Sequence, residues 1–318
     1  MFGFDDKIKF GNQKNDLLAV GELLIDMIAA EYDENFESQT FNKFFGGSPS
    51  NIAMNVKKLG IHSLVASAVG EDGLGSYLIN QLRKMDIDTS GIQRAKYSTS
   101  MVVLTKSTAT PVPIFYRGAD YHLAFNSVLN ESLMNSKIVH FSCWPISMEP
   151  VRHTIEKVIE IARNNHILVG FDPNYHPMIW QNGEDGIEYV KSIIGKVDVI
   201  KPSEDDAERL FGKDTHENQM KKFLDLGAKL VIMTLGKEGA IVSNGIETLK
   251  YSSLATKVID TTGAGDAFWS GFYTAAIKGY TIKDAISLGF AVSAYQLKYT
   301  GAVVDLPKLE AIKEQYGL

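Results

Sequence analysis

A glycine-rich turn near the C-terminal end of the chain contains the residues best suited to chemistry. The segment DTTGAGDAF at 260–268 follows a short apolar stretch and continues into residues with helical spacing. Small residues at a helix start leave backbone N–H groups uncovered, and the helix dipole adds about half a positive charge there. We therefore predict an anion-binding turn at Gly263, Ala264 and Gly265, with Asp266 as the base for an attacking hydroxyl.

The same turn has a plainer interpretation, in which its glycines only let a strand and a helix pack closely. Two better-known phosphate-binding patterns are absent from the sequence. The dinucleotide pattern GxGxxG fails because Phe268 stands at its third glycine position, which disfavours a nicotinamide dehydrogenase. No GxxxxGK[ST] loop occurs either, which disfavours an NTPase of the P-loop type.

A second candidate segment, GGSPSNIA, lies at 46–53. Gly46 and Gly47 would let the backbone approach a sugar closely, because neither residue has a side chain. Asn51, at a predicted helix start, offers both a donor and an acceptor to a hydroxyl. A capped helix entry without any ligand is the alternative interpretation.

Together, these two segments resemble the two signatures of the ribokinase/PfkB family of carbohydrate kinases, and they lie about 200 residues apart. The resemblance implies ATP-dependent phosphorylation of a sugar hydroxyl, with ATP and Mg²⁺ as cofactors. It also implies an α/β, ribokinase-like three-layer fold, with a mostly parallel central sheet, helices on both faces and a small β lid.

Other segments extend the resemblance over nearly the whole chain. GELLID at 21–26 is similar to the first strand end of the family, and FDPN at 171–174 is similar to a strand end near its active site. FYR at 115–117 resembles the lid segment of fructokinases. The substrate-binding residues that the resemblance implies are Asp26, Gly46, Gly47, Asn51, Arg117 and Asn174.

The residues expected to bind ATP are implied by the same resemblance. KPSEDD at 201–206 is similar to the NxxE element that organises magnesium and phosphates through water, with Ser203 and Asp206 in place of Asn and Glu. TLGKEG at 234–239 resembles the nucleotide loop, although a plain hairpin turn is an alternative interpretation there. Val258 and residues 291–295 would flank an adenine. The implied ATP contacts are Lys201, Ser203, Thr234, Gly236, Gly239 and Gly265.

Metal ligands are also implied by the resemblance. Asp206 would act on Mg²⁺ through water, and Asp260, Thr262 and Gly301 fall where related kinases bind a potassium ion.

The acceptor implied by the closest pattern is fructose, which would be converted to fructose 6-phosphate, because GGSPSN resembles the GGAPAN of fructokinases. The 2-keto-3-deoxygluconate kinases are the first alternative, and they carry an Arg where this chain has His176. A neutral imidazole holds a carboxylate less well than a guanidinium does, which favours a neutral sugar. Another sugar, a nucleoside and a catalytically silent sugar sensor also stay open.

Strands and helices that alternate along the chain are expected to position these residues. Apolar runs at 17–20, 64–69, 138–141, 167–171, 197–200, 230–233 and 240–242 indicate strands buried on both faces of a parallel sheet. Helical spacing follows most of them, and the last third is helical. We predict one domain over 1–318, with antiparallel strands at about 27–45 and 97–125 forming the lid.

Composition narrows the possible partners. The 318 residues carry a net charge of -6, with no basic block, so a nucleic-acid partner is not expected. The single cysteine, Cys143, and the lack of a signal-peptide pattern or a membrane-spanning apolar run predict a cytoplasmic protein without membrane attachment. The resemblance adds a homodimer formed through the lid.

Overall fold

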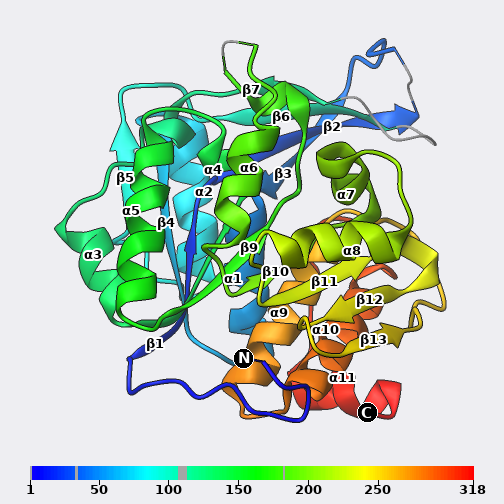
Figure 1. Ribbon diagram of the computed structural model, residues 1–318. Coiled ribbons are helices and arrows are strands. Elements are labelled where there is room, and N and C mark those ends of the chain that lie inside the picture. The colour runs from blue at the N-terminus through cyan, green and yellow to red at the C-terminus, as the bar shows by residue number, and fades with distance from the viewer. Residues whose placement is uncertain (1, 33–34, 107–112, 182) are drawn as a thin grey trace.

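The computed structural model describes residues 2–32, 35–106, 113–181 and 183–318. Within these residues a nine-stranded sheet forms the centre, in the order β13-β12-β11-β10-β9-β8-β1-β4-β5, and helices cover both of its faces (Figure 1). Its strands are β1 (Asn15–Val20), β4 (Ser63–Gly70), β5 (Ile92–Ala95), β8 (Ser136–Ser142), β9 (Leu168–Asp172), β10 (Val199–Ile200), β11 (Leu230–Thr234), β12 (Ala240–Ser243) and β13 (Thr248–Tyr251).

The predicted α/β fold with a mostly parallel sheet is confirmed. All neighbouring strands from β11 to β5 pair in parallel, whereas β12 pairs antiparallel with β11 and β13 antiparallel with β12. The prediction that 240–242 belongs to the parallel set is therefore wrong. The connection from β11 to β12 is a short turn, and a turn of that length can join only antiparallel neighbours.

The continuous apolar strands are buried on both faces, as predicted. Leu18 and Val20 of β1 pack into one hydrophobic core, whereas Leu17 packs into the core on the opposite face. Because successive side chains of a strand point to opposite faces, a strand covered on both sides must be apolar throughout.

Two groups of helices provide this cover. One face carries α3 (Ser127–Met134), α4 (Cys143–Ile146), α5 (Val151–Asn164), α6 (Ile187–Ile194), α7 (Glu204–Phe211) and α8 (His216–Asp225). The other face carries α1 (Ser48–Leu59), α2 (Gly73–Lys84), α9 (Ala264–Ile277), α10 (Ile282–Gln296) and α11 (Leu309–Tyr316). In the described part of the chain, no helix is both long and apolar enough to cross a membrane.

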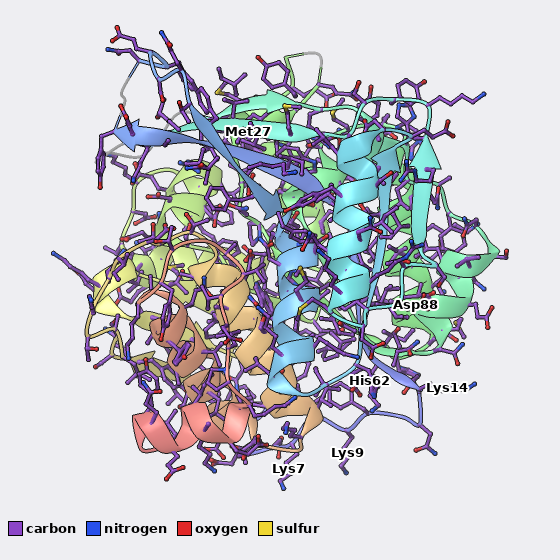
Figure 2. All side chains as sticks on the ribbon, turned by 180° about the vertical axis from the view of Figure 1, so that it is seen from behind. Lys7, Lys9, Lys14, Met27, His62 and Asp88 are labelled. Atoms are coloured by element: carbon purple, nitrogen blue, oxygen red, sulfur yellow. The ribbon has the colours of Figure 1, made fainter. Side chains whose placement is uncertain are left out.

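A separate four-stranded sheet lies at one end of the molecule. Its strands, in the order β3-β2-β6-β7, are β2 (Leu24–Tyr32), β3 (Phe41–Gly46), β6 (Met101–Lys106) and β7 (Ile114–Tyr116). They come from the two segments predicted as a lid, of which residues 33–34 and 107–112 lie outside the described residues. Figure 2 shows Met27 of β2 at the end opposite to Lys7 and Lys9 of the N-terminal segment.

This small sheet is not antiparallel throughout, so that part of the prediction is wrong. β2 pairs antiparallel with β3, but it pairs in parallel with β6. Between β2 and β6 the chain passes through β4 and β5 of the main sheet, and such a long connection allows the parallel arrangement.

Gly170, in the middle of β9, offers a test of how tightly the sheet packs beneath the site. A Cβ atom at this position would lie 1.7 Å from Tyr273 Oη, which shares a 2.8 Å hydrogen bond with buried His140. We expect Gly170→Ala to lower the free energy of unfolding by about 1–3 kcal/mol, because the added methyl group displaces the tyrosine.

Urea unfolding of both variants measures this effect, with Gly73→Ala as the matched control. Nothing lies within 4 Å of a Cβ at Gly73, so that variant should unfold like the wild type. Tyr273→Phe should relieve part of the cost of Gly170→Ala in the double variant. Equal stabilities for Gly170→Ala and Gly73→Ala would contradict the packing argument.

Candidate active site

A polar cavity of about 420 Å³ lies at the carboxyl ends of the parallel strands, beside the small sheet. Open α/β sheets generally bind their ligands at this edge. The cavity brings together thirteen of the predicted site residues: Asp26, Gly47, Asn51, Asn174, Lys201, Ser203, Asp206, Thr234, Thr262, Gly263, Ala264, Gly265 and Asp266.

Asp266, in the first turn of α9, is held by two side chains from the first turn of α1. Ser48 Oγ donates to Asp266 Oδ1 at 2.6 Å, and Asn51 Nδ2 donates to Asp266 Oδ2 at 2.9 Å. Burial raises the pKa of Asp266 to about 6, and the two hydrogen bonds oppose that rise. A carboxyl with this pKa is ionised near neutral pH and can accept a proton.

Asn51 has one polar atom left over. Its Oδ1 is buried, and no hydrogen-bond partner for it is found in the described part of the chain. Buried acceptors are nearly always satisfied in native structures, so an unsatisfied one that lines a cavity is a candidate for binding a ligand hydroxyl.

Two further acids line the same part of the cavity. Burial raises the pKa of Glu22 to about 8. The pKa of Asp26 is raised to about 7, first by burial and then by the charge of Asp266. Both groups therefore hold a proton for much of the time near neutral pH, and a protonated carboxyl can donate to a sugar oxygen as well as accept.

Gly46 and Gly47 fit closely around these acids. A Cβ atom at Gly46 would lie 2.4 Å from Asp26 Oδ2, and one at Gly47 would lie 2.4 Å from the Glu22 carbonyl oxygen. Gly47 also has a φ of 105°, which disfavours any residue with a side chain. The structure thus gives both glycines a packing role beside the acids.

The start of α9 has the uncapped geometry expected of the predicted anion-binding turn. Gly263 stands at the N-cap with a φ of 74°, and no side chain caps the helix. Lys201 Nζ would lie 3.2 Å from a Cβ at Gly265, so the lysine sits directly beside the turn. Uncovered helix N–H groups and a lysine together favour a phosphate group.

Lys201 is itself held by a buried pair of side chains. Its Nζ lies 3.1 Å from Asp172 Oδ2, which also accepts a 2.8 Å hydrogen bond from Trp269 Nε1. Lys201 and Asp172 are 4% and 5% exposed, so they can barely move without breaking the pair. This pair keeps the lysine charge at the helix start.

A second, more apolar cavity of about 610 Å³ adjoins the first, and the two share Lys201, Thr234, Thr261, Ala264 and Gly265. Gly236 and Gly239 line it, as do Val258 and Ala294, the residues expected beside an adenine. The cavities meet at the anion-binding turn, which is where the phosphates of a nucleotide would lie between a base and a sugar.

The carboxylate of Asp206, which is predicted to act on Mg²⁺, already accepts several hydrogen bonds. Asp206 closes a capping box with Ser203, and its Oδ1 also accepts a 2.6 Å hydrogen bond from the Tyr175 backbone. Both carboxylate oxygens of Asp206 are therefore engaged. Among the described residues, no group of three or more His, Cys, Asp or Glu side chains could hold a metal ion. Mg²⁺ that arrives with ATP needs only one or two carboxylates, because phosphates and water fill its other positions.

Of the residues predicted for potassium, Thr262 lines the first cavity, whereas Asp260 and Gly301 line neither of the two cavities. Asp260 accepts backbone hydrogen bonds from Thr262 at 2.9 Å and from Gly301 at 2.8 Å. The carboxylate of Asp260 thus joins the loop before α9 to the loop after α10.

Arg117 is, with Gly46, one of two predicted substrate residues that are not among those lining the first cavity. It does not line the cavity, and it forms a buried ion pair with Asp120. It also donates to Ser147 Oγ at 2.8 Å and to the Trp144 carbonyl at 3.2 Å. Since its donors are engaged, Arg117 supports Trp144, which does line the cavity.

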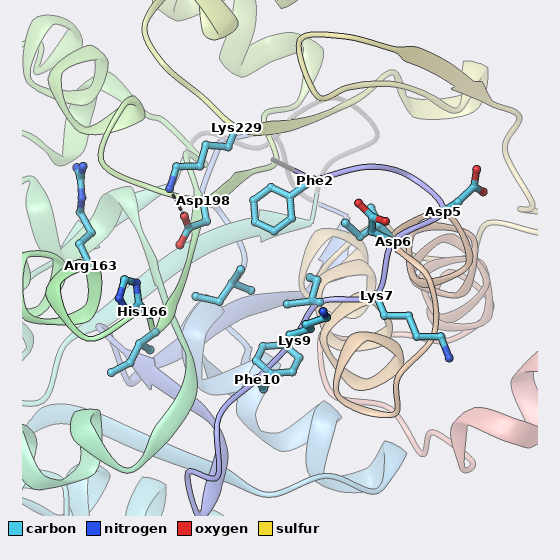
Figure 3. Close-up of a pocket in the computed structure, with 14 residues that line it drawn as sticks. Phe2, Asp5, Asp6, Lys7, Lys9, Phe10, Arg163, His166, Asp198 and Lys229 are labelled. Carbon is cyan, nitrogen blue, oxygen red and sulfur yellow. Dashed lines mark hydrogen bonds and ion pairs between the residues drawn. The ribbon is translucent and has the colours of Figure 1, made fainter.

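A larger cavity, of about 880 Å³, lies at the opposite, amino end of the strands beneath the N-terminal segment. Figure 3 shows Phe2 and Phe10 beside it, with Lys229 paired to Asp198. None of the predicted site residues lines this cavity. Cavity size alone therefore does not locate the chemistry.

Glu22, Ser48 and Asp172 are parts of the site that were not among the predicted site residues. Glu22 did leave a signal, because it is a charged residue inside an apolar stretch, and such residues are rarely buried without a reason. The sequence around Ser48 carries no signal that distinguishes this residue from an ordinary residue at a helix start. Its contact with Asp266 joins positions 218 residues apart.

Comparisons with known proteins identify the family. A model described as the pfkB family carbohydrate kinase matches residues 14–309. An ATP-dependent 6-phosphofructokinase from Thermoanaerobacterium thermosaccharolyticum is 59% identical over 318 residues, which cover 100% of this chain and 99% of that protein.

Solved structures of fructokinases are also similar to this chain. A fructokinase from Halothermothrix orenii is 41% identical with a TM-score of 0.77, and the match covers 86% of this chain and 97% of that chain. A fructokinase double mutant from Vibrio cholerae, solved with fructose, ADP and potassium ion, is 25% identical with a TM-score of 0.81, covering 96% and 99%. The chain therefore belongs to the pfkB family of carbohydrate kinases.

Proposed function

We propose that this kinase transfers the γ-phosphoryl group of ATP to a primary hydroxyl of a fructose-type ketohexose, with Asp266 as general base. One observation carries the proposal: the Asp266 carboxylate, which accepts a hydrogen bond from Asn51, stands in the first turn of α9, whose start no side chain caps. From there it can take the proton of the acceptor hydroxyl while the helix N–H groups stabilise the transferred phosphoryl group.

The acceptor would lie at the acidic end of the first cavity. Asp26 and Asn51 Oδ1 face it, and Asn174 lines it from the strand end beyond β9. The small sheet of β2, β3, β6 and β7 would act as the lid that excludes water, a competing acceptor for the phosphoryl group. Lid closure, a homodimer through the lid and a cytoplasmic location stay predictions.

ATP would occupy the second cavity, with its base near Val258 and Ala294 and its phosphates at Gly263 to Gly265. Lys201 would neutralise phosphate charge, and Mg²⁺ would supply further charge neutralisation when it is bound. Asp172 and Asp206 line the cavity on this side and are the carboxylates that would orient the metal's water ligands. Thr234, Gly236 and Gly239 would border the nucleotide.

Two acceptors share the fructose ring and are supported by different observations. Fructose 6-phosphate is supported by the relative that is 59% identical over the whole chain. Free fructose is supported by the fructokinase structures and by the charge of the cavity, because Lys201 is the single cation among the described residues that line it. A furanose ring carries a primary hydroxyl on each side, so one pocket could present either of them to Asp266.

Replacement of the base should separate chemistry from binding. We expect Asp266→Asn to lower kcat by about 10³-fold, because the amide keeps the size of the side chain but cannot accept the proton. ATP and sugar should still bind, as measured by calorimetry, and coupled ADP release measures kcat. Asp225→Asn, at an exposed surface pair, is the control. Near wild-type turnover of Asp266→Asn would show that another group is the base.

A panel of acceptors should identify the sugar. We expect the highest kcat/KM with fructose 6-phosphate, because the relative named for that substrate is 59% identical over the whole chain. The phosphate of this sugar would lie at the end away from Asp266. Ketodeoxygluconate and nucleosides should be at least about 100-fold poorer. A higher kcat/KM with free fructose would assign the acceptor that the acidic cavity favours, and no turnover with any acceptor would indicate a sensor.

Potassium is proposed at the junction of Asp260, Thr262 and Gly301, where an ion would tie the loop before α9 to the loop after α10. The fructokinase structure solved with a potassium ion supports the choice of ion. We expect activity to rise when KCl replaces tetramethylammonium chloride at equal ionic strength, because the ion would steady the anion-binding turn. Equal activities in the two salts would contradict the proposed potassium site.

A further inference from the structure

Ser48 makes a contact that the proposed reaction does not yet use. It lies at the first position of α1, and its hydroxyl donates to Asp266 Oδ1 at 2.6 Å. Together with Asn51 on the other oxygen, it fixes both oxygens of the catalytic carboxylate. Both groups donate to the base, and Asn51 in addition has an Oδ1 atom for which no partner is found in the described part of the chain.

The position of Ser48 is itself fixed by Glu22. The Ser48 backbone N–H donates to Glu22 Oε1 at 3.1 Å, and Ser50 Oγ donates to the Glu22 carbonyl at 3.0 Å. Ser142 Oγ donates to the Glu22 carboxyl at 3.2 Å from the end of β8. The buried Glu22 thus clamps the turn at Gly47, so the Ser48 hydroxyl has little freedom to turn away from Asp266.

We propose that Ser48 is a positioning residue for phosphoryl transfer, which orients the Asp266 carboxylate and favours its charged form through one hydrogen bond. The proposal rests on the proposed role of Asp266 as general base. A donor to a carboxylate stabilises the ionised state more than the protonated one, and such charge-assisted bonds are the stronger class of hydrogen bond.

The other charges around Asp266 come from several elements. Asp172 at the end of β9 raises its pKa, and Lys201 after β10 lowers it. Asp26 of β2 and Glu22 before β2 are the remaining acids near the α1 side of the cavity, and both have pKa values raised by burial. Ser48→Ala changes none of these residues, so a shift of the midpoint would report the loss of that single bond.

The direction of the expected pKa change follows from the loss of the Ser48 hydrogen bond. Loss of a donor that stabilises the carboxylate raises the pKa of Asp266, so a higher pH is needed to ionise the base. In the wild type, kcat/KM should rise with pH through a midpoint near the Asp266 pKa of about 6. In Ser48→Ala the midpoint should move upward by about half to one pH unit.

The experiment compares pH profiles of kcat/KM from about pH 5 to about pH 9 for the wild type and Ser48→Ala. Below the midpoint Ser48→Ala should be about three- to tenfold slower, and above about pH 8 it should be within about twofold of the wild type. The KM for the sugar at high pH should not change. Ser48→Thr, which keeps the hydroxyl, should restore the wild-type midpoint.

Ser192→Ala is the control, because it removes an exposed hydroxyl of α6 that donates to the Tyr189 carbonyl and bonds to neither Glu22 nor Asp266. Its midpoint should be that of the wild type, whatever its thermal stability. If Ser48→Ala melts too early to assay, Ser48→Cys replaces it, and its weaker donor should give an intermediate midpoint.

Two outcomes would overturn the proposal. A Ser48→Ala profile that superimposes on the wild type would show that the bond does not influence the base. A change confined to the sugar KM at every pH would make Ser48 a sugar ligand. Neither outcome touches the role of Asp266, which the Asp266→Asn variant tests separately.

Discussion

Two hydrogen bonds between the first turns of α1 and α9 hold the centre of this site together. They join Ser48 and Asn51 to Asp266 across 218 and 215 positions of the chain. The bonds exist because both helices cover the same face of the sheet, where residues such as Ile52 and Phe268 share one hydrophobic core. Burial of that apolar surface provides the free energy that keeps the polar groups in register.

The two ends of the site carry groups of different charge. The carboxyls of Glu22 and Asp26 lie at the end proposed for the acceptor, where burial raises the pKa of Glu22 to about 8 and that of Asp26 to about 7. The uncapped start of α9 and Lys201 lie at the phosphate end and favour negative charge. Asp266 lines the same cavity as these groups, which suits its proposed role of taking a proton from the acceptor while ATP delivers a phosphoryl group.

Local patterns were sufficient to predict the elements that position this site. The apolar runs predicted the central strands, and the small residues at 263–265 predicted an uncapped helix start. Weaker patterns were missed, such as β5 and α3, because short or mixed segments carry little periodic signal. The parallel pairing of β2 with β6 was also missed, since a pairing partner is a property of the folded chain.

The sequence by itself determined the family signatures, the alternation of strand and helix, and the residue types that could bind a sugar and a triphosphate. Only the tertiary structure decided which of those residues share a cavity. It placed Arg117 in an ion pair with Asp120 and brought Ser48 and Glu22 into the site. The physical reason is that hydrogen bonds, burial and pKa shifts depend on neighbours that packing brings together, often from positions far apart in the chain.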